Sequence, residues 1–207
     1  MSPATAAAAV RTPMSNQCAS AEHEAIEVRE EKLPVACCAK FGRTRFLCQR
    51  SANAFYFPHV LHVGPNLGCM LITYSIILAP TLIFVFANSL ASWVSVLLIV
   101  SIALTFLSFS MVACSDPGVI REHYVNAVGD DAGILCAHCQ IRRPLNAIHC
   151  YECEVCIDGM DHHCPWTGKC IGKKTLYWFY LFLWMICIHM TFGIGTVVYY
   201  CIGGRTS

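Results

Sequence analysis

The sequence predicts an all-α polytopic membrane protein, with three transmembrane helices and a small cysteine-rich domain between the second and the third. Only 13% of the 207 residues are charged, whereas soluble domains average about 25%. The charges are also unevenly placed, because no Asp, Glu, Lys or Arg occurs in residues 51–115 or 175–204. Between these apolar stretches, residues 136–170 hold seven cysteines and four histidines.

The first apolar stretch is long enough for two spans. A transmembrane helix needs about 20 apolar residues to cross a hydrocarbon core of about 30 Å. We therefore expect a transmembrane hairpin with spans at 68–87 and 90–114, joined by a polar turn at 88–89. The second stretch predicts a third span at 176–200, whose start is rich in Tyr and Trp, as is typical of a membrane interface. Buried helices of a soluble protein are a weaker alternative, because such helices are rarely this long and apolar.

Lysine and arginine are concentrated on one side of the predicted spans. Residues 1–50 carry seven of them and residues 116–174 carry six, whereas the turn between the first two spans carries none. By the positive-inside rule, the N-terminal tail and juxtamembrane segment (1–67) and the cysteine-rich loop (115–175) face the cytoplasm. The tail at 201–207 is too short to form a domain, as is expected if the chain is cut before a further helix. A net charge of +1 without a basic cluster argues against nucleic-acid binding.

The cysteine-rich loop has the ligand spacing of two zinc sites. Cytoplasmic cysteines stay reduced, so a dense cluster of Cys and His indicates metal rather than disulfides. The spacing C-x2-C-x9-H-x6-C occurs twice with a shift of 14 residues: the first set is Cys136, Cys139, His149 and Cys156, and the second is Cys150, Cys153, His163 and Cys170. Each set is a closed Cys3His site, which is typical of structural zinc. Only the repeat favours His163 over its neighbour His162.

Three candidate residues are left over, namely His138, His162 and Cys164. The run Asp161-His162-His163-Cys164 combines a carboxylate, an imidazole and a thiol. His162 is suited to accept the thiol proton and Asp161 to orient the imidazole, as in other catalytic triads. The alternative is an inert, buried thiol. Because the third span begins twelve residues after Cys164, we expect this thiol at the membrane face, where lipid-tailed substrates are found.

The motifs of the loop follow one known pattern. They are Arg143-Pro144, the metal-ligand spacing, Asp161-His162-His163-Cys164-Pro165-Trp166, Cys170-Ile171-Gly172 and Phe179, with Asp116-Pro117-Gly118 after the second span. Together they resemble the DHHC family of protein S-acyltransferases, over about residues 42–200. The resemblance implies that Cys164 accepts a palmitoyl or other long-chain acyl group from acyl-coenzyme A as a thioester and transfers it to protein cysteines. It also implies two structural Zn²⁺ ions, juxtamembrane cysteines as acceptors, and a place in the Golgi, ER or plasma membrane.

The chain departs from the family pattern at several points. Lys169 and Thr175 stand where the family usually has Asn. The fourth span and the Thr-Thr-x-Glu element of the family do not occur in these 207 residues. The sequence is therefore compatible with a fragment or with a divergent member. The second hypothesis for its function is a catalytically impaired, membrane-anchored zinc-binding adaptor, which would tolerate the loss of Cys164.

Further residues are candidates for binding the acyl donor. We expect the acyl tail to pass between the spans from Trp166 and Phe179, although ordinary packing explains these aromatics equally well. His189 lies thirteen residues into the third span, and intramembrane ionisable residues are candidate functional groups. We expect it to set the acyl-chain length at the end of a cavity; a hydrogen bond to a neighbouring helix is the alternative. Candidate partners of the coenzyme A phosphates, or of lipid headgroups, are Arg142, Arg143, Lys173 and Lys174.

Overall fold

The computed structural model describes residues 39–49, 56–87, 90–121 and 133–203. These residues belong to the larger of two units of the chain, residues 33–207. Most of the predicted N-terminal tail, the turn at 88–89 and the last four residues lie outside the described part.

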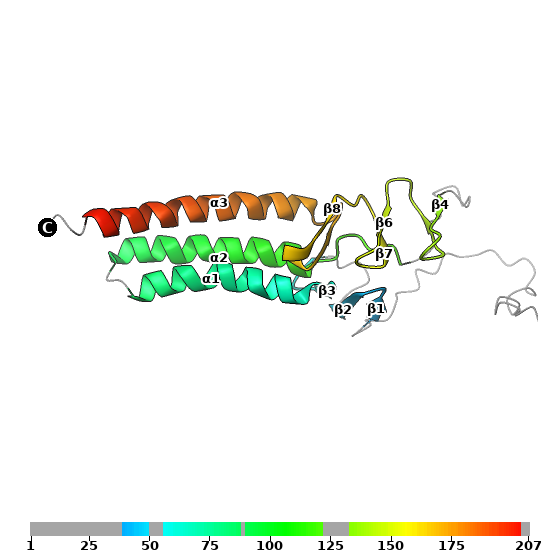
Figure 1. Ribbon diagram of the computed structural model, residues 1–207, viewed down its shortest axis with the longest axis horizontal. Helices are drawn as coiled ribbons and strands as arrows, with labels where there is room; N and C mark the ends of the chain where they lie inside the picture. Colours follow the sequence, from blue (N-terminus) through cyan, green and yellow to red (C-terminus); the bar gives the residue numbers. More distant parts are fainter. Residues whose placement is uncertain (1–38, 50–55, 88–89, 122–132, 204–207) are drawn as a thin grey trace, which may run out of the picture. The chain divides into compact units, whose positions relative to one another are not determined.

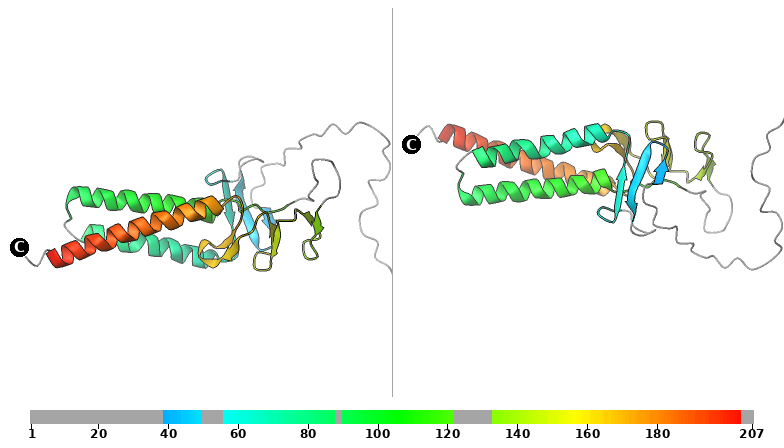
Figure 2. Two further views of the ribbon diagram at one scale, coloured as in Figure 1. Left: turned by 90° about the horizontal axis from the view of Figure 1, so that it is seen from above. Right: turned by 90° about the horizontal axis from the view of Figure 1, so that it is seen from below.

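Three helices account for the predicted spans. They are α1 (Leu67–Ala87), α2 (Ser92–Cys114) and α3 (Leu176–Val198), followed by the π-helical turn Tyr199–Gly203. All three are long and apolar enough to cross a membrane, and at 1.5 Å per residue each is more than about 30 Å long. Their bounds differ from the predicted spans by at most two residues. The helices lie side by side, with α2 packed against both α1 and α3 (Figures 1 and 2).

The contacts between the helices are aromatic near the cysteine-rich domain and polar further along. Phe109 of α2 is fully buried, and its ring lies 4.7 Å from Tyr74 of α1 and 5.0 Å from Phe182 of α3. Tyr74 also shares a hydrogen bond of 2.9 Å with Ser110. Large apolar side chains cover the outside of the helices, as lipid surroundings require.

The membrane-proximal regions contain strands, so the prediction of an all-α protein is imprecise. A three-stranded antiparallel sheet consists of β1 (Ala39–Phe41), β2 (Thr44–Gln49) and β3 (Val60–Val63). The cysteine-rich loop forms three hairpins: β4 (Ile134–Leu135) with β5 (Arg142–Arg143), β6 (Ile148–Cys150) with β7 (Val155–Ile157), and β8 (His162–Cys164) with β9 (Lys169–Ile171). Strands of two or three residues are too short to show a period of two in the sequence.

The N-terminal sheet and the cysteine-rich loop share one core. Phe46 of β2 is 1% exposed and packs with Val155, Ile157 and cysteines of the loop. The turn at Gly42 lies so close to the loop that an added Cβ would come within 2.4 Å of the Glu154 carbonyl oxygen. The next residue, Arg43, donates its backbone N–H to the Cys153 carbonyl at 2.9 Å. The segment predicted as juxtamembrane is therefore part of the domain that carries the site.

Candidate functional site

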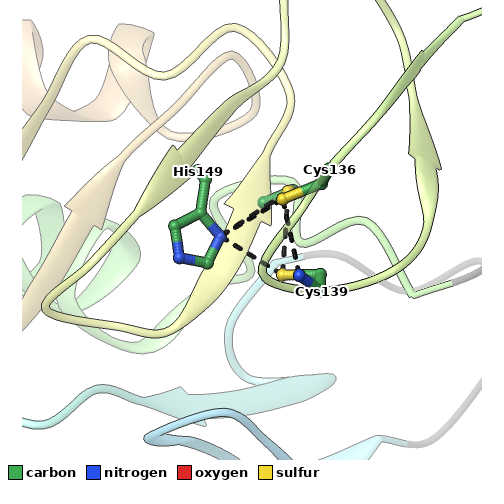
Figure 3. Close-up of side chains that lie close together, drawn as sticks. Cys136, Cys139 and His149 are labelled. Carbon is green, nitrogen blue, oxygen red and sulfur yellow. Dashed lines mark hydrogen bonds between the residues drawn. The ribbon is translucent and has the colours of Figure 1, made fainter.

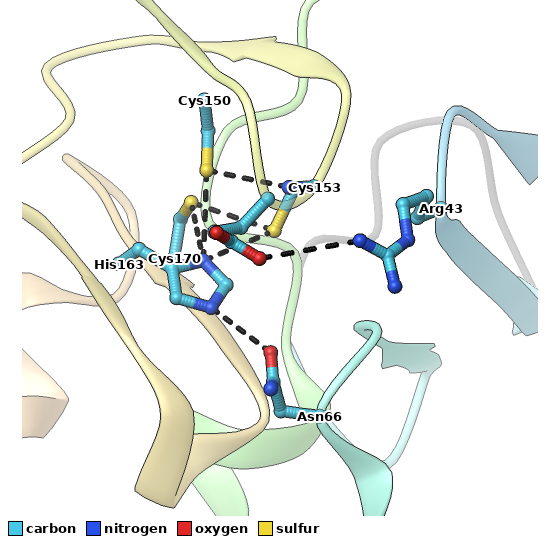
Figure 4. A network of polar contacts seen from close by, with 7 residues as sticks. Arg43, Asn66, Cys150, Cys153, His163 and Cys170 are labelled. Carbon is cyan, nitrogen blue, oxygen red and sulfur yellow. Dashed lines mark hydrogen bonds and ion pairs between the residues drawn. The ribbon is translucent and has the colours of Figure 1, made fainter.

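Both predicted ligand sets converge in space. In each set the four ligand atoms all lie within 4.8 Å of one another. Figure 3 shows three members of the first set, in which Nδ1 of His149 is 3.7 Å from Sγ of Cys136 and 3.2 Å from Sγ of Cys139. Figure 4 shows the second set, in which Nδ1 of His163 lies 3.4–3.6 Å from three sulfur atoms, those of Cys150, Cys153 and Cys170.

These separations fit a tetrahedral zinc ion. Zinc holds sulfur at about 2.3 Å and nitrogen at about 2.0 Å, so ligand atoms around a tetrahedral centre lie about 3.5–3.8 Å apart. The observed separations centre on this range, with extremes of 3.2 Å and 3.9 Å from Nδ1 of His149 to the sulfurs of Cys139 and Cys156. The sulfurs of Cys139 and Cys156 are 3.8 Å apart, and those of Cys153 and Cys170 are 3.6 Å apart. With four protein ligands, neither set leaves a position for water, which is the arrangement of a structural site.

The three thiols of the second set share hydrogen bonds that separate their pKa values. Hydrogen bonds from Cys153 and Cys170 lower the pKa of Cys150, while the same contacts raise the pKa of Cys153 to about 12 and raise that of Cys170. Without metal, two of the three thiols, those of Cys153 and Cys170, therefore keep their protons. A divalent cation removes this constraint, because it binds the thiolate forms.

Asn66, at the entry to α1, contacts a ligand of the second set. Its Oδ1 lies 3.0 Å from Nε2 of His163 (Figure 4). This bond fixes the imidazole with a proton on Nε2 and leaves the Nδ1 lone pair directed at the sulfurs. Sequence spacing did not find Asn66, because it is distant from the cysteines along the chain. Its backbone N–H also bonds the Gly168 carbonyl at 3.1 Å, which joins the second ligand set to the start of α1.

Strand β8 places the two neighbouring histidines on opposite faces. Side chains alternate between the faces of a strand, and His163 points to the ligand cluster. His162 and Cys164 are therefore on the opposite face. There His162 contacts Phe179, with ring centroids 5.2 Å apart, and Cys164 packs in the same cluster as Phe179. This alternation distinguishes His163 from His162 on grounds other than the repeat.

Cys164 borders an apolar cavity of about 300 Å³ among the helices. The thiol-bearing residue is 8% exposed and packs against Val112 and Ile171. The cavity is lined by Thr73, Ile76, Phe109, Cys164, Trp166, Thr167, Phe179, Phe182 and Leu183. Both aromatics predicted to receive an acyl tail are among them. Trp166 is 60% exposed at the rim, and its carbonyl accepts a hydrogen bond of 2.9 Å from Thr73 of α1.

The predicted base and its carboxylate are paired. Nδ1 of His162 lies 2.7 Å from Oδ2 of Asp161, so a proton on Nδ1 leaves Nε2 as the acceptor. Within the described residues no hydrogen bond joins His162 to Cys164, although the two side chains share a face of β8. Catalytic hydrogen bonds are often formed only once substrate is bound.

Lys169, one of the departures from the family pattern, is completely buried behind the site. Its ammonium group donates hydrogen bonds to the carbonyl oxygens of His62, at 2.8 Å, and of Ser115, and to Nδ1 of His62 at 3.2 Å. Burial lowers the pKa of Lys169 to about 7, and burial together with this cation keeps the pKa of His62 well below its ordinary value. Since Lys169 pairs with Cys164 in the β8–β9 hairpin, it ties the strand opposite the thiol to β3 and to the end of α2.

The Asp-Pro-Gly element forms a second buried link. One carboxylate oxygen of Asp116 accepts the backbone N–H groups of Gly118 and Val119, both at 2.9 Å, and the other accepts a hydrogen bond of 2.9 Å from Arg121. The Arg121 guanidinium lies over the ring of Phe46, 3.9 Å from its centroid. The end of α2 is thereby connected to the N-terminal sheet.

The four cations predicted to bind phosphate lie apart from the Cys164 cavity. Arg142 and Arg143 form β5, whereas Lys173 and Lys174 precede α3. Lys173 lies 3.7 Å from a carboxylate oxygen of Asp158. Burial lowers the pKa of Lys174. None of the four lines the cavity beside Cys164.

His189 links all three helices. Its Nε2 lies 2.8 Å from Oγ1 of Thr81 in α1, and its Nδ1 lies 2.8 Å from Oγ of Ser101 in α2. These are the hydrogen bonds to neighbouring helices that the sequence analysis left as the alternative. His189 and Thr81 also line a second apolar cavity of about 230 Å³, which follows the Cys164 cavity along α1 and α3.

Comparison with known proteins gives a consistent family. Residues 131–206 match the family described as DHHC palmitoyltransferase. Palmitoyltransferase ZDHHC17 of Danio rerio is 35% identical over 169 residues, which cover 73% of this chain and 26% of the relative. Palmitoyltransferase ZDHHC17 of Rattus norvegicus is 37% identical over 149 residues (64% and 24%), and palmitoyltransferase Hip14 of Drosophila melanogaster is 33% identical over 114 residues (48% and 18%). The chain spans about a quarter or less of the length of these relatives.

Proposed function

The chain belongs to the DHHC palmitoyltransferase family, and from this premise we propose that it is a protein S-acyltransferase whose acyl carrier is Cys164. The observation that carries the proposal is the position of this thiol. It borders an apolar cavity among three membrane-length helices and is held there by a hairpin whose other face carries His163 of the second Cys/His set. An adaptor that only binds partners has no need for a thiol in this place.

The proposed reaction consists of two thioester exchanges. His162, oriented by Asp161 at 2.7 Å, takes the proton of the Cys164 thiol. The thiolate attacks the carbonyl carbon of the acyl-coenzyme A thioester, a new C–S bond forms, and the bond to the coenzyme A sulfur breaks. The departing thiolate takes up the proton held by His162. A protein cysteine then attacks the acyl-enzyme in the same way, and Cys164 leaves as the thiolate and is reprotonated.

Zinc has a structural part in this proposal. The two Cys3His sets would hold one Zn²⁺ each, which would order the short hairpins of a loop that has few large apolar residues. The order of these hairpins determines the position of Cys164. The chain's own contribution is the hairpin geometry: His163 faces the ligand set while His162 and Cys164 face the cavity.

We assign the acyl tail to the path between α1 and α3. It would enter at Trp166 and Phe179 and follow the two consecutive cavities toward His189. Phe179 and His189 are ten residues apart, which corresponds to about 15 Å along the helix. His189, fixed by Thr81 and Ser101, would limit the length of chain that fits. Burial of each CH2 group contributes about 0.8 kcal/mol to binding of the tail.

The remaining assignments concern the donor headgroup and the acceptors. Arg142, Arg143, Lys173 and Lys174 would bind the phosphates of coenzyme A on the cytoplasmic side. Acceptors would be cytosolic or membrane proteins with cysteines near the membrane, because Cys164 is held at the end of the helices. The enzyme would act at the Golgi, ER or plasma membrane.

The experiment is an acyl-enzyme assay on membranes that contain the full chain. Labelled palmitoyl-coenzyme A should give hydroxylamine-sensitive label on wild type and on Cys187→Ala, which removes an exposed thiol of α3, but not on Cys164→Ala. Zinc content should be equal in all three. Absence of label from a wild type that retains its zinc would refute the proposal and favour the impaired adaptor.

A further inference from the structure

The β1–β2 hairpin places three cations close together. Lys40 of β1 and Arg45 of β2 are directly opposite each other in the antiparallel register, and Arg43 lies in the turn between the strands. Like charges opposite each other across two strands destabilise a sheet. The hairpin therefore bears an electrostatic cost that a bound anion would offset.

These cations surround a pocket. It has a volume of about 420 Å³ and is lined by Lys40, Arg43, Arg45, Leu47, Val63, Gly64, Pro65 and Leu67, with no acidic side chain among them. Arg43 has a contact of 4.0 Å with Glu152, but both side chains are more than half exposed, and such pairs contribute little. Within the described ranges, no ion pair with an acidic residue is present at Lys40 or Arg45.

The pocket is at the start of a membrane-length helix. Leu67, which lines it, is the first residue of α1. Leu67 and Leu71, one turn further along, are 43% and 54% exposed. The site thus presents cations at the interface and an apolar surface directly below them. By the positive-inside rule this end of α1 faces the cytoplasm, where the leaflet is rich in anionic lipids.

We propose that this pocket binds the phosphate-bearing headgroup of an anionic phospholipid of the cytoplasmic leaflet. Lys40, Arg43 and Arg45 donate charged hydrogen bonds to the phosphate oxygens, and the first acyl chain follows Leu67 and Leu71 along α1. The lipid then fixes the N-terminal sheet, which shares its core with the cysteine-rich domain, against the membrane surface. The site is separate from Cys164 and does not depend on acyl transfer.

Native mass spectrometry of the detergent-purified full chain tests this proposal, because it counts bound lipid and bound zinc in one spectrum. The probes are dioctanoyl phosphatidylinositol 4-phosphate and dioctanoyl phosphatidylcholine. The test variant is Lys40→Gln/Arg45→Gln. The matched control is Arg11→Gln/Arg29→Gln, which removes the same charge from the N-terminal tail.

Wild type and the control variant should bind one molecule of the anionic lipid, in preference to phosphatidylcholine and in the presence of excess coenzyme A. Lys40→Gln/Arg45→Gln should bind it at least about tenfold more weakly with the same zinc count. Equal binding by all three proteins would overturn the proposal. Displacement of the lipid by coenzyme A, together with weaker coenzyme A binding by Lys40→Gln/Arg45→Gln, would also overturn it and assign the pocket to the acyl donor.

Discussion

The contact between Asn66 and His163 predicts that a residue outside the cysteine-rich loop controls one of the two zinc sites. Replacing Asn66 by Ala removes the acceptor that lies 3.0 Å from Nε2 of His163. The backbone bond from Asn66 to Gly168 at 3.1 Å does not involve the side chain and should persist. The imidazole then loses the partner that fixes its orientation and its protonated nitrogen.

The expected loss follows from what such partners contribute elsewhere. Removing the hydrogen-bond partner of a metal-bound histidine costs about 10–100-fold in metal affinity, which corresponds to about 1.4–2.8 kcal/mol. Only the set of Cys150, Cys153, His163 and Cys170 should be affected. Among the hydrogen bonds of the described residues, His149 of the other set is joined only to cysteines of its own set, and its ring stacks on His138 at 4.7 Å.

The assay is zinc competition against a chromophoric chelator, with the purified chain in detergent. In Asn66→Ala one of the two zinc ions should be lost at about 10–100-fold lower chelator concentration than in wild type, while the other is unchanged. Asn66→Asp keeps an acceptor oxygen and should behave like wild type. Two zinc affinities equal to those of wild type in Asn66→Ala would refute the reasoning, and equal weakening of both would show a general loss of folding instead.

Four further changes test other parts of the account. Phe179→Ala should lower the rate of acyl-enzyme formation about tenfold, because about 1.4 kcal/mol of apolar contact with the acyl tail is lost. An unchanged rate would mean that Phe179 packs against its protein neighbours and does not bind the acyl tail. His189→Ala should raise the preference for stearoyl over palmitoyl donors by up to about tenfold, since two more CH2 groups can be buried. An unchanged preference in competition assays would show that His189 does not limit the length of the acyl chain. Lys169→Met leaves three buried acceptors without their donor and should lower the free energy of unfolding by at least about 2 kcal/mol, which is measured as a lower thermal midpoint. The control Lys173→Met, at an exposed position, should change the thermal midpoint little. Equal midpoints for the two variants would contradict the buried network. The pKa of His62 is lowered in the folded chain, so below about pH 6.5 the unfolded chain binds more protons and the free energy of unfolding falls as the pH decreases. In His62→Gln the free energy of unfolding should fall less steeply with decreasing pH. An identical slope would show that other groups cause the decrease.

Much of the architecture was predictable because it depends on composition and spacing. Each of the three membrane-length helices that the structure describes lies in a charge-free stretch, since length and hydropathy alone indicate a candidate span. The repeated spacing grouped eight ligands into the two sets that converge in the structure. Ligands of such a site recur at regular spacings in the sequence, because the C-x2-C turn and the hairpins between the ligands have fixed lengths.

The contacts that depend on the tertiary structure were not predictable. Asn66 and His62 carry no motif, and their roles arise only because α1 and β3 meet the β8–β9 hairpin. The sheet of residues 39–63 was missed because its strands are short and lie beside a membrane span, where aromatic and basic residues also indicate an interface. Lys169 was noted only as a departure, and the buried acceptors around it explain how a lysine fits there.

The most direct test of the central claim is the intact mass of the purified, zinc-loaded chain after incubation with palmitoyl-coenzyme A. We predict a gain of one palmitoyl group that hydroxylamine removes, present in wild type and in Cys187→Ala and absent from Cys164→Ala. A gain of the same size in Cys164→Ala, or none in zinc-loaded wild type, would contradict the claim that Cys164 is the acyl carrier.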